Sequence, residues 1–457
     1  MKNKILVIGA ARSGVAAALL LLKKGHQVVL TDRRSEDLIL AEFPELSQYR
    51  KSLKNEALEL FLGHQIAAER AIEFSEIIVS PGVPLEISIL QKARDLNIPI
   101  HSEIELAYRN TESTIIAITG TNGKTTTTVL TGEMFKTAEK SVYVTGNVGE
   151  PVCQHIVDSK PRDTFVIEVS SFQLETIEKF RPKIALITNL SPDHLNRHKT
   201  LENYYAAKTR IFENQTETDY LILNADDVTV CELGKQAKSQ KYYFALNKKV
   251  AQGAYTLEGV LYLSDQGIDH EICAIEEIGI KGPHNLQNAM GAVMIAYYSG
   301  IDVQTIQKTL KTFKGVEHRQ EFVRTVKGVD YINDSKGTNT NAAITALKAM
   351  TKPVILIAGG YDKSEDYGDF IDNIKKKVKR LILIGATASA IEKTAREKDY
   401  VMIEKVSDYE AAVEVAARCA TTGDVVLLSP ACASWDMFDN YEIRGKIFKD
   451  LVWRLED

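Results

Sequence analysis

The sequence predicts an α/β protein of three domains, each built around a mostly parallel sheet. Its length of 457 residues corresponds to about three domains of ordinary size. Its composition, with 44% hydrophobic and 26% charged residues, is that of a globular chain. Short apolar runs alternate with helix-like stretches along the whole chain, which is typical of parallel sheets whose strands are joined by helices.

The apolar runs fall into three blocks, which we assign to domains 1–110, 111–314 and 315–457. No long Gly, Ser or Pro linker marks either boundary, so the boundaries rest on the grouping of the strands. Ligands of open parallel sheets gather outside the carboxyl ends of the strands, and the residues just after each strand are therefore the candidates for function. The predicted strands are 4–10, 28–32, 77–82 and 98–103; 114–120, 164–170, 183–190 and 219–226; and 329–335, 352–360, 380–385 and 424–430.

Composition and charge exclude several classes of protein. The net charge is −5 and no basic block is present, which disfavours a nucleic-acid or anionic-membrane partner. Arg12 interrupts the first apolar run too early for a signal peptide, and the apolar stretch 15–22 is too short to span a bilayer. Five cysteines without CxxC spacing argue against a zinc site or a disulfide framework. We expect a cytoplasmic monomer that acts on small molecules.

The segment "TIIAITGTNGKTTTTVL" (114–130) is a candidate phosphate-binding turn. An apolar strand leads into a Gly-rich turn, and a helix starts at the lysine, so backbone N–H groups and the helix dipole can both face an anion. The match to GxxxxGK[ST] is imperfect because Ile118 occupies the first Gly position. We expect Lys124 to reach the β and γ phosphates and Thr125 to bind Mg²⁺. The turn as a whole comprises Gly120, Thr121, Asn122, Gly123, Lys124, Thr125 and Thr126.

Two further strands of the central block end in residues that suit Mg²⁺ or its water shell. Glu168 stands near the end of strand 164–170, and Asp193 and His194 follow strand 183–190. A histidine after a strand is commonly an ordinary loop residue. Glu168, Asp193 and His194 are expected at the same sheet edge as the phosphate turn, and this shared position favours a metal site.

Lys208 interrupts the apolar face of a predicted helix. In "LENYYAAKTRIF" it lies four residues after Tyr204 and four before Phe212, both on the apolar face. A lysine in that position either extends outward to solvent or has a depressed pKa and a task. A buried neutral amine can add CO₂ to form a carbamate, an anion able to bind Mg²⁺.

The first block begins with "GAARSG", which resembles a dinucleotide fingerprint but has Ala11 at the second Gly position, so NAD binding is disfavoured. Another phosphate-bearing ligand remains open, as does a domain that serves only as scaffold. The candidate contacts are Arg12, Ser13, Asp32, Arg33, Arg34, Ser80, Pro81 and Gly82.

In the last block the segments after the strands carry lysines and hydroxyl groups that suit a carboxylate, although solvated loops would explain them equally well. These residues are Lys336, Thr338, Lys363 and Ser434.

Taken together, these motifs resemble those of the Mur ligases over essentially the whole chain. The ordered segments are "GTNGKTTTT", "EVSSFQLET", "SPDHLNRH", "YYAAK", "GPHNLQNAMGA", "EHRQE", "NDSKGTNT", "GGYDKSED" and "SPACASWDMF". Within the family, the chain most resembles the branch that adds D-glutamate, because its first domain is Rossmann-like and it lacks a "DNPR" segment.

The resemblance implies a fold and an activity. The first and last domains would be Rossmann-like and the central domain a P-loop-type ATPase. ATP would activate the carboxylate of UDP-N-acetylmuramoyl-L-alanine as an acyl phosphate, and the amine of D-glutamate would then displace phosphate, in cytoplasmic peptidoglycan precursor synthesis. Two Mg²⁺ ions and a carbamylated Lys208 would assist, with Lys124, Glu168 and His194 as further catalytic residues; no general base is assigned.

The resemblance also implies three sets of binding residues. Besides the phosphate turn, the nucleotide would contact Asn285, Asn288, Arg319 and Asp334. The UDP substrate would also contact Asn147 and Ser170, and D-glutamate would contact Lys336, Thr338, Lys363, Ser434 and Tyr441. The metal ions would in addition be held by Thr125, Glu168, His194 and Lys208.

Two other functions remain open from the sequence. One is a sister ligase that adds a different amino acid, or a folate polyglutamylating ligase, although the Rossmann-like first domain disfavours the latter. The other is a P-loop protein that uses ATP as a switch for binding a partner, which would leave Lys208 and the lysines of the last block without a purpose.

Overall fold

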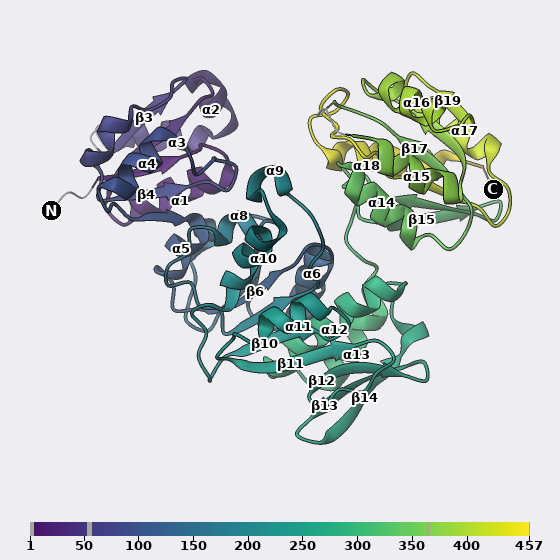
Figure 1. Ribbon diagram of the computed structural model, residues 1–457, viewed down its shortest axis with the longest axis horizontal. Helices are drawn as coiled ribbons and strands as arrows, with labels where there is room; N and C mark the ends of the chain where they lie inside the picture. The colour runs from purple at the N-terminus through teal and green to yellow at the C-terminus, as the bar shows by residue number, and fades with distance from the viewer. Residues whose placement is uncertain (1–3, 53–56, 363–365, 457) are drawn as a thin grey trace. The chain divides into compact units, whose positions relative to one another are not determined.

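The structure is a computed structural model that describes residues 4–52, 57–362 and 366–456. The chain forms two compact units, Met1–Phe313 and Lys314–Asp457. Unit one contains a five-stranded and a nine-stranded sheet, and unit two contains a six-stranded sheet. Figure 1 draws the three sheets in purple, in blue to green, and in green to yellow. The predicted α/β class with three domains is confirmed.

The first sheet is fully parallel in the order β3-β2-β1-β4-β5, and its inner strands are buried on both faces. Such burial explains the continuous apolar runs of the sequence, because helices cover both faces of a parallel sheet. The elements are β1 (Lys4–Ile8), α1 (Arg12–Lys23), β2 (Gln27–Asp32), α2 (Glu36–Glu42), α3 (Pro44–Ser52), β3 (Leu58–Leu62), β4 (Glu76–Val79), α4 (Ser88–Asp95), β5 (Ile100–Ser102) and α5 (Glu103–Tyr108).

The central sheet has the order β14-β13-β12-β11-β10-β9-β6-β8-β7, parallel from β12 to β7 and antiparallel among β12, β13 and β14. Its elements are β6 (Thr114–Thr119), α6 (Lys124–Thr137), β7 (Val142–Gly146), α7 (Val152–Ile156), β8 (Thr164–Glu168), α8 (Ser171–Leu174), β9 (Ile184–Ile187), α9 (Leu195–His198), α10 (Leu201–Thr209), β10 (Tyr220–Asn224), α11 (Val228–Gly234), β11 (Gln240–Ala245), β12 (Gly253–Leu257), β13 (Val260–Asp265), β14 (Ile268–Ala274), α12 (Pro283–Tyr298) and α13 (Val303–Thr312).

The third sheet has the order β15-β16-β20-β17-β18-β19 and is parallel except at β15. Its elements are β15 (Glu321–Val326), β16 (Val329–Asn333), α14 (Thr340–Ala349), β17 (Val354–Ala358), α15 (Gly368–Lys377), β18 (Val378–Leu383), α16 (Ala388–Glu397), β19 (Ile403–Lys405), α17 (Tyr409–Cys419), β20 (Val425–Leu428) and α18 (Tyr441–Arg454).

All twelve predicted strands are present, although their ends differ by a few residues. The strands that sequence analysis did not predict lie mainly at sheet edges or in the antiparallel hairpins. They are β3, β7, β11, β12, β13, β14, β15 and β19. Edge and hairpin strands are less buried, so they carry weaker apolar runs.

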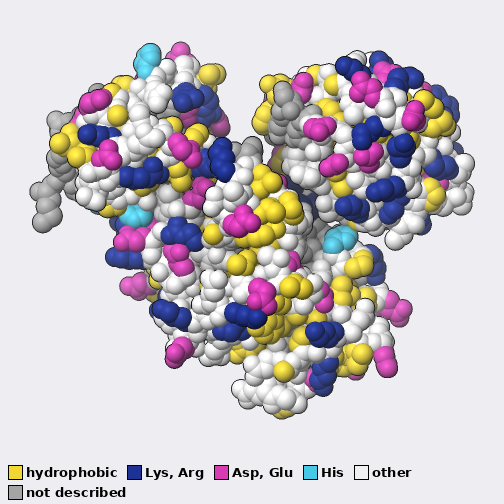
Figure 2. Space-filling view, viewed as in Figure 1, with side chains coloured by type: hydrophobic (Ala, Val, Ile, Leu, Met, Phe, Trp, Pro, Cys, Tyr) yellow, Lys and Arg dark blue, Asp and Glu magenta, His cyan; other side chains and the backbone are white. Residues whose placement is uncertain are grey.

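The surface bears on possible partners. On the face drawn in Figure 2, basic and acidic side chains are intermixed, so that face has no continuous basic surface. Within the described part of the chain, no helix is both long enough and apolar enough to cross a membrane.

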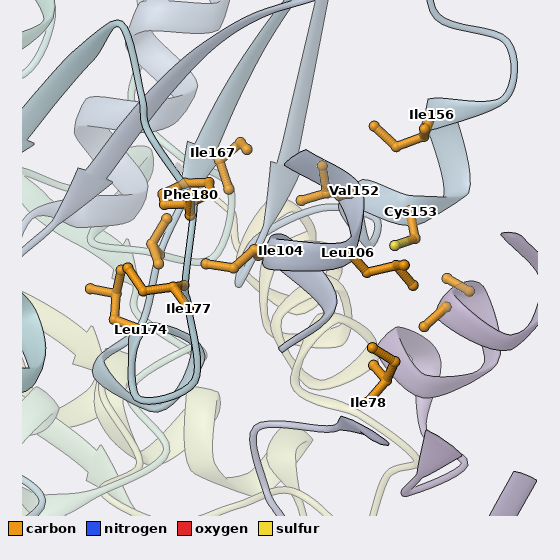
Figure 3. Close-up of a cluster of buried hydrophobic side chains, with 14 of the residues drawn as sticks. Ile78, Ile104, Leu106, Val152, Cys153, Ile156, Ile167, Leu174, Ile177 and Phe180 are labelled. Carbon is orange, nitrogen blue, oxygen red and sulfur yellow. The ribbon is translucent and has the colours of Figure 1, made fainter. Parts of the chain in front are cut away.

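The two domains of unit one share a buried cluster in which α5 packs against α7. Ile104 and Leu106 of α5 lie beside Val152 and Cys153 of α7, as Figure 3 shows. Glu103 is buried in this region, and one of its oxygens accepts a hydrogen bond from the Cys153 backbone N–H at 2.6 Å. Its other oxygen has no partner among the described residues. Burial raises the pKa of the Glu103 carboxyl to about 7.

The Glu103 pKa predicts a pH-dependent stability. The pKa is raised above its ordinary value of 4.5, so the favourable contribution of the protonated form is complete below about pH 4.5 and disappears as pH rises through about 7. Glutamine at position 103 does not titrate, so the stability of Glu103→Gln relative to wild type should increase by roughly 1–3 kcal/mol as the pH rises through this window. Urea unfolding between pH 4.5 and 8 measures the difference, with the exposed Glu112→Gln as control. Parallel stability curves for wild type and Glu103→Gln would contradict the expectation.

Candidate functional site

The turn between β6 and α6 adopts a conformation that requires glycine at two positions. Gly120 has φ +140° and Gly123 has φ +85°. A Cβ atom at Gly120 would lie 2.0 Å from the Thr188 hydroxyl oxygen, and one at Gly123 would lie 2.1 Å from the Asn288 side-chain oxygen. Both positions therefore combine a left-handed backbone with a close approach that excludes a side chain. The turn fits closely against the end of β9 and against α12.

Backbone and side-chain hydrogen bonds fix the turn to the segment after β9. The Thr121 N–H donates to the Asn189 carbonyl at 2.8 Å, and the Asn122 N–H donates to Asn189 Oδ1 at 2.9 Å. The Thr188 hydroxyl donates to the Asn122 carbonyl at 2.6 Å. Thr188 and Asn189 were not among the predicted site residues. They lie within the end of the predicted strand 183–190, whereas β9 ends at Ile187, so both residues belong to the segment after the strand.

Lys124 lies across the turn at the start of α6. Its Nζ donates to the carbonyls of Gly120 at 3.0 Å and Thr121 at 2.8 Å. Thr125 and Thr126 follow in the first turn of the helix and are buried. A lysine ammonium and the amino end of a helix beside a glycine turn form an arrangement suited to a phosphate chain.

Lys208 is buried beside the same turn, which decides between the two alternatives that the sequence left open. It is 2% exposed, and its Nζ donates to the Gly120 carbonyl at 2.7 Å. Burial lowers the pKa of the Lys208 amine well below its ordinary value, and the positive charge of Lys124 lowers it further, while Asp193 and Glu168 act in the opposite direction. The amine is therefore biased toward its uncharged, nucleophilic form.

Glu168 and His194 lie at the carboxyl edge of the sheet, close enough to Lys208 for their charges to interact. Glu168 Oε1 accepts a hydrogen bond from Asn147 Nδ2 at 2.7 Å, whereas its buried Oε2 has no partner among the described residues. Burial lowers the pKa of His194; Asp193 raises it, and the charges of Lys208 and Lys124 lower it. A carboxylate oxygen without a partner and an imidazole biased to its neutral form fit a divalent cation.

Tyr204 is a residue of this site that sequence analysis assigned only to the apolar face. Its side chain is buried, and its hydroxyl lies 3.1 Å from the Thr121 hydroxyl oxygen. Lys208 Nζ lies 4.9 Å from the centre of its ring. The tyrosine thus contacts both the phosphate turn and the buried lysine.

Asn285 and Asn288 of α12, named from the resemblance, also lie at the phosphate turn. The buried Asn288 contacts Gly123 and donates from Nδ2 to Asn285 Oδ1 at 3.3 Å. Asn147 lies beside Glu168. Ser170 instead caps α8, where its hydroxyl accepts the Gln173 N–H at 3.3 Å.

The candidate residues of the first domain separate into two groups. Asp32, Arg33 and Gly82 line a cavity of about 230 Å³ at the carboxyl edge of the sheet. Arg12 points elsewhere: its guanidinium donates to the Gly149 carbonyl at 2.7 Å, and it lines a separate cavity of about 300 Å³ beside α7. Ser13 lies in the first turn of α1, next to Arg12.

Asp32, which lines the first cavity, and two further candidates, Arg34 and Ser80, form hydrogen bonds with the backbone of the first domain. Burial alone would raise the pKa of Asp32, but hydrogen bonds from the Arg34 N–H at 2.9 Å and the Ala10 N–H at 2.7 Å lower it. Arg34 also donates to the Ala10 carbonyl at 2.9 Å. The Ser80 hydroxyl donates to the Gly9 carbonyl at 3.0 Å, and Pro81 follows it in the same turn.

In unit two, Asp334 is the most perturbed candidate. Burial raises its pKa to about 6, although Ser429 donates a hydroxyl hydrogen bond to it at 2.7 Å and the charge of Arg319 acts in the opposite direction. Lys336 Nζ lies 5.5 Å from the centre of the Tyr441 ring. Thr338 donates its N–H to the Lys336 carbonyl at 2.9 Å.

Ser434 and Lys363 are two further candidates of unit two. Ser434 is buried, whereas Lys363 lies outside the described residues. Arg444 was not among the predicted site residues; its buried guanidinium donates to the Ser335 carbonyl at 2.7 Å and to the Ser335 hydroxyl at 3.0 Å. Its position within a helix gave no signal of this role.

The close fit at Gly123 predicts that Gly123→Ala loses ATP affinity by at least roughly tenfold, because the new methyl group displaces Asn288 or the turn. Gly259→Ala is the matched control: Gly259 has φ +80°, but a Cβ there meets no atom within 4 Å. It therefore shares the backbone strain without the clash. Calorimetric titration with ATP compares the variants, and equal affinity of Gly123→Ala and wild type would contradict this account of the turn.

Three domain families match the chain in succession. Residues 3–102 match the Mur ligase MurD-like N-terminal domain, residues 118–296 the Mur ligase middle domain, and residues 318–432 the Mur ligase glutamate ligase domain. The chain also resembles two solved structures, which share its fold. UDP-N-acetylmuramate-alanine ligase of Thermotoga maritima has a TM-score of 0.58 and 18% identity over 98% of this chain and 99% of that one. A pseudomurein peptide ligase type C of Methanothermus fervidus has a TM-score of 0.58 and 20% identity over 99% and 100%.

Sequence relatives match the chain from end to end. The UDP-N-acetylmuramoylalanine--D-glutamate ligase of Caldanaerobacter subterraneus subsp. tengcongensis is 47% identical over 99% of both chains. The protein of the same name from Clostridioides difficile is 43% identical over 99% of both chains. Identity at this level over the full length shows common descent, and the chain belongs to the Mur ligase family.

Proposed function

We propose that this protein joins UDP-N-acetylmuramoyl-L-alanine to D-glutamate at the expense of ATP, in the synthesis of peptidoglycan precursors. The observation that carries the proposal is the arrangement of Lys124 and Lys208 on one glycine turn, with Glu168 near Lys208 and one of its oxygens without a partner among the described residues. Such a site can hold a triphosphate and the acid that receives its terminal phosphoryl group. The names of the full-length relatives supply the two substrates.

The chemistry follows from the poor reactivity of a carboxylate. The L-alanine carboxylate oxygen attacks the γ-phosphorus of ATP, the bond to the β-phosphate oxygen breaks, and ADP leaves. The amine of D-glutamate then attacks the acyl carbon; the C–N bond forms, phosphate departs, and the amine loses a proton. Because an acyl phosphate hydrolyses, the reacting groups must be shielded from water, which closure of the third domain would provide.

The roles of the nucleotide-binding residues follow from their positions. The segment Gly120–Thr126 would surround the phosphates, with Lys124 neutralising negative charge as the γ-phosphoryl group moves. Asn285 and Asn288 would contact the nucleotide from α12, and Arg319 and Asp334 would contact it from unit two. Lys124 is the residue that meets the reacting phosphate in this proposal.

The donor set also fits Mg²⁺, with two ions in the proposal. Glu168 Oε2, His194 and Thr125 would hold them, together with Lys208 as a carbamate. The neutral Lys208 amine would add CO₂, with formation of one N–C bond and release of one proton. A buried side chain that could carry a positive charge would thereby become an anion. Bound Mg²⁺ supplies charge neutralisation for phosphoryl transfer.

The three substrates would each be bound mainly by a different domain of the chain. Residues 1–110 would bind the UDP group at the cavity lined by Asp32 and Arg33, with Asn147 toward the sugar, and residues 111–314 would bind ATP. Residues 315–457 would bind D-glutamate, for which we propose Lys336, Thr338, Lys363, Ser434 and Tyr441. The protein would act as a cytoplasmic monomer.

A phosphate-release assay tests the substrate assignment. With ATP, Mg²⁺ and UDP-N-acetylmuramoyl-L-alanine present, D-glutamate should drive phosphate release at least roughly a hundredfold faster than L-lysine or diaminopimelate, since a site built for one side chain leaves buried polar groups unpaired with another. Preference for L-lysine or diaminopimelate would reassign the amino-acid substrate. Release that none of these amino acids stimulates would favour an ATP switch instead.

A further inference from the structure

Arg197 connects the substrate cavity of the first domain to the central domain. It lies in α9, three residues after His194. One arm of its guanidinium, Nη1, donates to the Val83 carbonyl at 2.9 Å, and the other, Nη2, donates to Glu175 Oε2 at 2.7 Å. Val83 follows β4 and lines the same cavity as Asp32. The side chains of Arg197 and Glu175 are only 16% and 17% exposed, so solvent screens the pair weakly.

On the central-domain side, the pair leads to the residues around His194. Glu175 Oε1 lies 3.5 Å from His198 Nδ1, and His198 Nε2 lies 2.9 Å from the Ser171 hydroxyl oxygen. These contacts hold the α8 and α9 segments together. His198 is 3% exposed in its side chain, so the connection is formed within the protein interior.

Phe172 is the point at which Arg197 and His194 meet. The Arg197 guanidinium lies 5.4 Å from the centre of the Phe172 ring, and the His194 ring lies 5.0 Å from it. His198 stacks on the same ring at 5.4 Å with an interplanar angle of 19°. Arg197 and His194 therefore share one aromatic neighbour.

We propose that Arg197, held by Glu175, is a positioning residue that couples the UDP-substrate cavity to His194. The guanidinium is planar with donors in fixed directions, so it cannot follow a shift of the Val83 carbonyl without moving relative to Glu175 and Phe172. A ligand that orders the turn containing Val83 would thereby also order His194, which lies on the side of the reacting groups. The inference rests on the proposed function in that the cavity receives the UDP substrate.

The test uses the full chain free of metal and nucleotide, titrated with UDP-N-acetylmuramoyl-L-alanine. Calorimetry gives the affinity, and NMR of labelled histidine, with His194→Ala for assignment, gives the response of the His194 ring. In wild type the His194 signal should shift on binding. Arg197→Ala should bind roughly tenfold more weakly, since a charge-assisted hydrogen bond is removed. At saturation its His194 signal should stay near the free position.

Two conservative variants and one control complete the design. Arg197→Lys keeps the charge but not the two-armed geometry, and Glu175→Gln removes the ionic partner, so both should show reduced His194 shifts. Arg181→Ala is the control, because Arg181 pairs with Asp219 at 2.7 Å near the amino end of β9, far along the strand from the site. Its binding and its His194 response should equal those of wild type.

Each alternative outcome has a distinct meaning. A full His194 shift in ligand-saturated Arg197→Ala would overturn the coupling, even if affinity falls. An unchanged His194 signal in ligand-saturated wild type would overturn it as well. If wild type fails to bind the UDP substrate, the proposed function itself fails, and this inference fails with it.

Discussion

The burial of Lys208 against the Gly120 carbonyl is the constraint on which the rest of the site depends. An ammonium group in this position would face Lys124 with little solvent between them, and the lowered pKa of Lys208 expresses that cost. The protein retains a potential charge where an apolar side chain would pack without penalty. A neutral amine that becomes a carbamate would resolve the cost and supply an anion beside Glu168 and His194.

The surrounding structure holds the turn in the shape that this lysine requires. Glycines at 120 and 123 admit the close approach of Thr188 and Asn288, and Asn189 fixes the turn through its backbone and side chain. Because β6, β8 and β9 are parallel neighbours, their carboxyl ends bring these residues to one edge. The buried cluster between α5 and α7 and the hydrogen bond from Arg197 to Val83 then connect the first domain to that edge.

The sequence predicted most of the inner parallel strands and the glycine turn before α6 because both depend on local patterns. Continuous apolar runs reflect burial on two faces, and the position of Lys208 on the apolar face of its helix singled this residue out, although extension to solvent remained open from the sequence. Partners that meet only in three dimensions carry no local pattern. Thr188, Asn189 and Arg197 are polar residues on or near loops, and Arg12 matched a nucleotide fingerprint although its side chain contacts Gly149. Ser170, which the resemblance implies as a substrate contact, caps a helix, a role that its sequence context did not suggest.

Chemical rescue of Lys208→Ala tests the central claim most directly. If a carbamate on Lys208 supplies an anion at the site, the variant should lose turnover by at least roughly a thousandfold, and formate or acetate at high concentration should restore part of it by occupying the vacated volume. The exposed Lys136→Ala should show neither effect. Full activity of Lys208→Ala, or loss that no small carboxylate relieves while the fold remains intact, would contradict the account.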